Sequence, residues 1–178
     1  MKYSCPPLSR KQLRAYAKSI RTSLKVETSL MFPVERFLEA LHLLIGDESF
    51  SFQTIADEDW DQPPSRHAYF DLTDNCIYIK ESVYLGAIDG NGRDRMTIIH
   101  ECAHVLLLQH SHLTLARSFD NEYVPPYCDP EWQAKCLAGE LMVPIDLVTD
   151  MSASEVSFKC GVSLRAAEYQ LNKYREAS

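Results

Sequence analysis

Residues Arg95 to His110 read R-M-T-I-I-H-E-C-A-H-V-L-L-L-Q-H. This stretch contains an H-E-x-x-H motif, in which His100 and His104 lie one above the other on the same face of a helix. Two imidazoles placed in this way can share one metal ion, and Glu101, the next residue in the chain, can reach a water bound to that ion. The motif therefore predicts a helix that carries a metal site.

The helix around the motif is apolar on nearly every face. A helix of this kind is either buried or spans a membrane, and with about 16 residues and charged groups at its centre it is too short for a span. Burying Glu101 without a partner is costly, and a water on a bound metal is one partner that removes this cost. The alternative is a core helix whose histidines bond to backbone carbonyls and whose glutamate meets an arginine. The apolar residues are Met96, Ile98, Ile99, Ala103, Val105, Leu106, Leu107 and Leu108.

The composition is that of a soluble globular chain, with 46% hydrophobic and 24% charged residues. Its formal net charge of −7 disfavours a broad surface for direct nucleic-acid binding. The first residues lack the apolar run of a signal peptide and no stretch is long enough for a bilayer, so we expect a cytoplasmic protein without membrane contact. The six cysteines form no C-x-x-C pair and are expected to be free thiols.

Hydrophobic periodicity predicts one α+β domain over residues 1–150, followed by a helical segment at 151–178 that packs on it. The domain is expected to contain helices within 9–45, a sheet at about 50–85, the motif helix at about 92–109 and a further helix at about 130–143. Residues 67–72 and 76–80 flank a turn-forming tripeptide and so predict an antiparallel hairpin. In the C-terminal segment acidic and basic residues nearly balance, which favours packing on the domain or docking a partner over reading DNA.

A catalytic zinc site usually has three protein ligands, so a third ligand has to be found outside the motif. His110 stands at the ligand spacing of metzincins, but that geometry requires a glycine where this chain has Leu107. If the helix continues through Leu107, His110 lies about 240° round the helix from His104 and faces the wrong way. His110 is therefore a weak candidate.

Glu131 is the stronger candidate for the third ligand. It follows Asp129 and Pro130, which have the residue types of a helix N-cap and first position. An acidic group that heads an apolar stripe needs a buried partner, although Glu131 could equally sit there because acidic groups are stabilised at helix N-termini. Glu140 is about 180° away on the same helix and is predicted to face solvent. The stripe consists of Ala134, Leu137, Ala138, Leu141 and Met142.

The segment H-E-C-A-H at 100–104, followed by D-P-E-W-Q-A-K-C-L-A-G-E-L-M-V-P at 129–144, resembles the ImmA/IrrE family of metallopeptidases. In that family an H-E-x-x-H helix is followed by a helix of the pattern E-x-x-A-x-x-F-A-x-x-L-L-M-P. The resemblance covers roughly residues 51–144. Leu137 replaces the usual phenylalanine, and Leu108 stands where a histidine is often found.

The resemblance implies a fold like a minimal zincin, with a small, twisted, mostly antiparallel sheet against the motif helix. It implies that His100, His104 and Glu131 hold one Zn²⁺ per chain, with Mn²⁺ or another divalent ion also compatible. It further implies that Glu101 is the general base of a regulatory endopeptidase. The substrate expected from the family is a helix-turn-helix repressor or antitoxin in a stress or mobile-element response.

Two questions stay open at the level of sequence. A hydrogen-bond donor for the oxyanion is expected, and Tyr123 and Tyr127 are both candidates between which the sequence does not choose. The chain could also be a toxin-like, metal-containing partner that binds such a repressor without cutting it. The intact Glu101 favours the enzyme, because a pure binding module has little need of that base.

Overall fold

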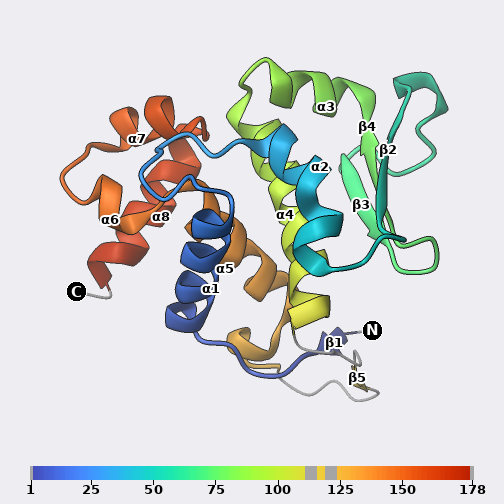
Figure 1. Ribbon diagram of the computed structural model, residues 1–178, viewed down its shortest axis with the longest axis horizontal. Coiled ribbons are helices and arrows are strands. Elements are labelled where there is room, and N and C mark those ends of the chain that lie inside the picture. Colours follow the sequence, from blue (N-terminus) through green and yellow to red (C-terminus); the bar gives the residue numbers. More distant parts are fainter. Residues whose placement is uncertain (1, 111–115, 119–123, 177–178) are drawn as a thin grey trace.

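The computed structural model describes residues 2–110, 116–118 and 124–176, and shows a small sheet at one side of the molecule with the helices packed beside it (Figure 1). The predicted α+β class is confirmed. The two N-terminal helices are α1 (Arg10–Ser23), which Ser9 caps by accepting a hydrogen bond from the Gln12 amide, and α2 (Val34–Ile45). None of the helices in the described ranges has the length and apolarity needed to cross a bilayer.

The main sheet has three strands, β2 (Ser51–Ile55), β3 (Ala68–Asp71) and β4 (Cys76–Lys80), in the order β2-β4-β3. Strands β3 and β4 form the predicted antiparallel hairpin, and Asn75 adopts a left-handed φ of 50° at its turn. Strand β2 pairs in parallel with β4, which the alternating sequence pattern does not predict. The sheet is mixed because the hairpin places β4, rather than β3, beside β2. A second pair joins β1 (Lys2–Ser4) to β5 (Ala116–Ser118).

Helix α3 (Glu81–Ile88) occupies the end of the region that the sequence assigned to the sheet, so the expected boundary at about residue 85 is wrong. The Asp57 carboxylate, far upstream, accepts a hydrogen bond of 2.9 Å from the Ser82 amide and thereby caps this helix. Val83 and Ala87, one turn apart, are buried under it. The helix therefore depends on a cap supplied by the loop at η1 (Asp57–Asp59), which local periodicity does not reveal.

Helix α4 (Gly92–His110) is the centre of the fold and packs against α2, α3, β3 and α5 (Pro130–Met142). Its helical backbone continues through Leu107 to His110. Most of its circumference is buried, as expected for a helix that is apolar on nearly every face. Its residues that are at most 1% exposed are Ile98, Ile99, Cys102, Ala103, Val105 and Leu106.

The chain after α5 forms α6 (Ile145–Val148), α7 (Ala153–Cys160) and α8 (Leu164–Glu176). Residues of α7 and α8 belong to the same buried hydrophobic cluster as α4 and α5. The start of α4 lies so close to the tail that a Cβ on Gly92 would be 2.4 Å from the Val162 carbonyl carbon. Only glycine fits at this position, because the neighbouring atoms belong to backbone that cannot rotate away.

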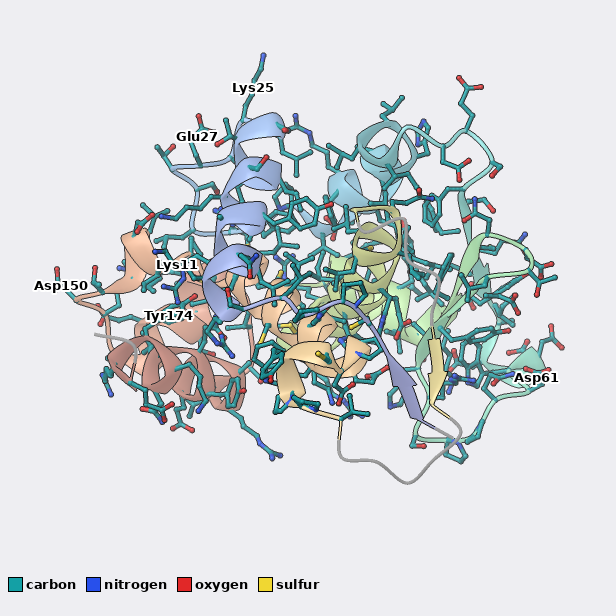
Figure 2. The ribbon with its side chains drawn as sticks, turned by 90° about the horizontal axis from the view of Figure 1, so that it is seen from below. Lys11, Lys25, Glu27, Asp61, Asp150 and Tyr174 are labelled. Atoms are coloured by element: carbon teal, nitrogen blue, oxygen red, sulfur yellow. The ribbon has the colours of Figure 1, made fainter. Side chains whose placement is uncertain are left out.

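Glu140 is only 3% exposed, so the prediction that it faces solvent is wrong. Helix α5 packs on α4 with one side and on α1 and α8 with another, which leaves no solvent face there. The Glu140 carboxylate accepts hydrogen bonds from Arg14 Nε at 2.9 Å, Arg10 Nη1 at 3.3 Å and Tyr174 Oη at 3.2 Å. Figure 2 shows Tyr174 between α1 and α8, whereas the labelled Asp150 extends outward.

Candidate metal centre

Helix α4 presents His100 and His104 from a part of its surface that other elements leave partly exposed. The two residues are one turn apart, and each side chain is about 20% exposed. Their Nε2 atoms face each other at 3.2 Å. Two neutral imidazoles in this arrangement can share only one proton, whereas a bound cation accepts the lone pairs of both.

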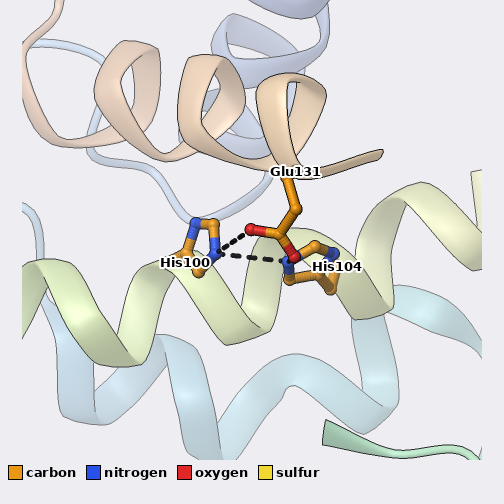
Figure 3. Close-up of side chains that lie close together, drawn as sticks. All are labelled: His100, His104 and Glu131. Carbon is orange, nitrogen blue, oxygen red and sulfur yellow. Dashed lines mark hydrogen bonds and ion pairs between the residues drawn. The ribbon is translucent and has the colours of Figure 1, made fainter. Parts of the chain in front are cut away.

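Helix α5 brings Glu131 to the same place. Asp129 accepts a hydrogen bond of 2.9 Å from the Glu131 amide and Pro130 occupies the first position, so this end of the helix is fixed by its own sequence. Ala134 and Ala138 are fully buried, and their small side chains let α5 lie close to α4. The Glu131 carboxylate consequently points at the two imidazole rings of α4 (Figure 3).

The spacing of the three side chains fits a small divalent cation. Glu131 Oε2 is 3.4 Å from His100 Nε2, and Glu131 Oε1 is 3.2 Å from His104 Nε2. One ligand atom from each residue lies within 4.8 Å of the others. Zinc–nitrogen bonds of about 2.0–2.1 Å in a tetrahedron place neighbouring ligand atoms about 3.3 Å apart. The residues His100, His104 and Glu131 therefore form a triad of two nitrogens and one oxygen that could hold a metal ion.

The charge on Glu131 is set by the two histidines. Their hydrogen bonds hold the pKa of the Glu131 carboxyl far below its ordinary value, against a smaller raising effect of burial. Its side chain is 60% exposed, while the two histidine side chains that it meets are each about 20% exposed. The carboxylate is ionised at neutral pH and is ready to act as a ligand.

Glu101 lies beside the triad and lines the same cleft. Burial raises the pKa of its carboxyl, while His100 and His104 lower it and the charge of Glu131 raises it further. A hydrogen bond from the Phe70 backbone also lowers this pKa. A carboxylate whose proton affinity is raised in this way suits a group that accepts and releases a proton during a reaction.

Of the other sequence candidates, only Tyr127 has a described side chain, and it is not at the triad. Helix α4 does not break at Leu107, so the backbone condition for His110 as a ligand is absent, and the His110 side chain lies outside the described part of the chain. Tyr127, in η2 (Pro126–Cys128), is 49% exposed and is not among the residues that line the cleft. Tyr123 lies outside the described residues. All six cysteines are free thiols, as predicted.

The triad opens into a cleft of about 1150 Å³. Helix α4 forms its floor, the β3 edge of the sheet forms one wall, and α5 and α8 form the other. Sequence reasoning did not identify His67 and Arg93, which both line this cleft and lie 2.8 Å apart between Nε2 and Nη2. The helical spacing could have identified Arg93, because a residue seven positions before His100 lies on the same face of the helix.

Comparison of the chain with models of known protein families and with curated proteins finds no match.

Proposed function

We propose that this protein is a cytoplasmic zinc-dependent endopeptidase that cleaves a helix-turn-helix repressor or antitoxin. The observation that carries the proposal is the convergence of His100, His104 and Glu131 from two helices, with Glu101 beside them in an open cleft. This is the residue set that metal-dependent hydrolysis of an amide requires: three protein ligands, a position left for water or substrate, and a carboxylate base.

Zinc held by these three side chains would act as a Lewis acid that polarises a peptide carbonyl and makes water a stronger acid. The residues of the chain supply the proton transfers. Glu101 accepts a proton from the water as the water oxygen attacks the carbonyl carbon of the peptide bond. Glu101 then gives that proton to the leaving amine as the carbon–nitrogen bond breaks, which returns its carboxylate to the starting state.

The edge of β3 offers a way to hold the substrate chain. The Lys80 amide donates to the His67 carbonyl, so His67 and Lys80 are a hydrogen-bonded pair of the β3–β4 ladder. Hydrogen-bonded and non-hydrogen-bonded pairs alternate along an antiparallel ladder, so the backbone N–H and C=O of Tyr69 also point to β4. The backbone groups of Ala68 and the carbonyl of Phe70 therefore point away from β4, and no strand in the described ranges pairs with them. The Phe70 amide also points away from β4, but it is hydrogen-bonded to the Glu101 carboxylate. Both residues line the cleft, where an extended peptide could pair with them as an added strand.

The substrate class comes from the family resemblance of residues 100–104 and 129–144, which pairs this site with repressor-type partners. Co-incubation of the purified protein with a candidate repressor from the same genome tests the proposal. We expect time-dependent cleavage that a chelator abolishes and added zinc restores. Binding and relief of repression without any cleavage would instead support a non-catalytic partner.

A further inference from the structure

The cleft around the triad is electrically asymmetric although the whole chain carries a formal charge of −7. Its acidic lining residues, within the described part of the chain, are Glu101, Asp129 and Glu131, all at or beside the triad. Its cationic lining residues are Arg66, Arg93, Lys135 and Arg165. The cleft thus contains a group of cations outside the metal centre that the proposed chemistry does not use.

Three of these four cations, Arg66, Arg93 and Arg165, gather at one end of the cleft, whereas Lys135 lies on α5 one turn from Glu131. Arg93 precedes His100 by seven residues on α4, which places it on the same face about 10 Å along the axis. Its Nη2 donates to Nε2 of His67, so Arg93 bridges the cleft floor to the segment that leads into β3. Arg165 is the second residue of α8, and the residues just before that helix contact the start of α4 at Gly92. Arg66, Arg93 and Arg165 therefore lie towards the N-terminal end of α4.

These arginines lack acidic partners in the part of the chain that the structure describes. No ion pair to a carboxylate involves Arg66, Arg93 or Arg165, and all three are exposed. Arg66 donates to the Gln62 amide oxygen at 3.1 Å and lies over the Tyr69 ring. By contrast, Arg10 and Arg14 of α1 form ion pairs with the buried Glu140. Arg66, Arg93 and Arg165 thus place positive charge in the lining of the cleft without a carboxylate paired to it in the described residues.

We infer that this end of the cleft, defined by Arg66, Arg93 and Arg165, selects peptide segments with acidic side chains close to the scissile bond. The inference rests on the proposed function, since it names the substrate class of the same site. A carboxylate is the complementary group, because guanidinium groups bind carboxylates with paired hydrogen bonds. Acidic substrates would also be attracted to this region before they bind.

The direction of β3 also predicts on which side of the scissile bond the acidic residues of the substrate lie. His67 lies beside Arg93 and the Phe70 backbone lies beside Glu101, so β3 runs in the same direction as α4. A peptide added antiparallel to β3 runs the opposite way, with its carboxyl end towards Arg93. Arg93 and His100 are about 10 Å apart along the α4 axis. An extended peptide advances about 3.3 Å per residue, so Arg93 would lie about three residues from the scissile bond, on its carboxyl side.

Two measurements test this inference. Cleavage of a mixture of peptides by the zinc-loaded wild type, read by mass spectrometry, should show Asp and Glu enriched two to four residues after the cleaved bond. Binding of fluorescent peptides to the Glu101→Gln protein should be about tenfold tighter for a peptide with a Glu-Asp pair than for its Gln-Asn counterpart. Raising the salt from about 50 to about 500 mM should remove most of this difference.

Variants assign the effect to the named residues. Arg93→Gln and Arg165→Gln should each reduce the preference for the Glu-Asp peptide about threefold, and the double variant should nearly abolish it. Arg36→Gln is the matched control, because Arg36 is exposed on α2 and does not line the cleft. All three arginines are exposed, so these changes should leave the folded state intact.

The outcomes separate this inference from the proposed function. Cleavage with no acidic enrichment, or with enrichment on the amino side, overturns the inference and leaves the peptidase proposal standing. If acidic peptides bind through Arg93 but no peptide in any mixture is cut, the charge preference of the cleft is supported and the peptidase proposal is contradicted. An equal loss of preference in Arg36→Gln would show that net charge, and not this end of the cleft, is responsible.

Discussion

Oε1 of Glu131 lies 3.2 Å from Nε2 of His104, although the two residues belong to different helices. The contact exists because α5 packs along α4 and because the Asp129 cap fixes the first turn of α5. The ligand set therefore joins the helix of the H-E-x-x-H motif to a second helix that begins after a long connection. Disturbing either the ligand or the anchoring of its helix should weaken metal binding.

Glu131→Ala should lose the metal while His110→Ala retains it. The first change removes one of three ligand groups, and the second alters a residue whose helix continues unbroken through Leu107. Elemental analysis of both variants after gel filtration measures the difference. Retention of metal by Glu131→Ala together with its loss from His110→Ala would identify His110 as the third ligand instead.

Gln133→Ala should weaken metal binding about tenfold or more, in the range known for groups that orient metal ligands. Gln133 is 1% exposed, and its amide donates to the carbonyls of Pro6 at 2.8 Å and Tyr127 at 2.7 Å. These bonds tie the N-terminal segment and the η2 turn to the start of α5, two residues from Glu131. Zinc titration against a competing chelator gives the affinity.

The matched control for this change is Gln53→Ala, because Gln53 is exposed on β2 and belongs to a different part of the fold. Its zinc affinity should equal that of the wild type. If Gln133→Ala also binds zinc like the wild type, the hydrogen bonds of Gln133 have no part in placing Glu131.

Glu140→Ala should destabilise the fold strongly. Removing one partner from a buried ion pair costs about 3–5 kcal/mol, and we expect the lower end of this range because Arg10 and Arg14 keep some contact with water. Urea denaturation measures the change in the free energy of unfolding. The exposed pair of Lys18 and Asp146 provides the control, since Asp146→Ala should change that free energy by less than about 1 kcal/mol. Equal effects of the two changes would contradict this account.

The sequence predicted the parts of the fold in which local pattern and tertiary role agree. The motif helix, the hairpin of β3 and β4, and the capped start of α5 all carry their own signals in spacing, turn residues and N-cap residues. For the same reason both motif histidines and Glu131 could be identified before their contacts were known. Helical spacing placed the histidines together, the apolar stripe that follows Glu131 made it the stronger third candidate, and the family resemblance assigned it as a ligand.

The sequence could not predict features that depend on distant segments. The burial of Glu140 follows from a second packing surface on α5, and a helical wheel that assumes one buried face misses it. Helix α3 depends on a cap from Asp57, and the parallel pairing of β2 depends on which hairpin strand lies beside it. The grouping of cations at one end of the cleft likewise needs three elements that are far apart in the chain.

Glu101→Gln should keep the fold and the metal but lose peptide cleavage. Glutamine preserves the size of the side chain and much of its hydrogen bonding, but it cannot accept the proton from the attacking water. Removing a general base of this kind costs about 10²–10⁴ in rate. Wild type and variant are compared at equal metal content by a time course of substrate cleavage on a gel. Equal rates would mean that Glu101 is not the base.

The most direct test of the central claim is the metal content of the protein purified without added metal. X-ray absorption should then define the ligands of the bound ion. We predict one zinc per chain, bound by two imidazole nitrogens and carboxylate oxygen, as the triad of His100, His104 and Glu131 requires. Substoichiometric metal that added zinc does not restore, or a coordination shell containing thiolate sulfur, would contradict the account.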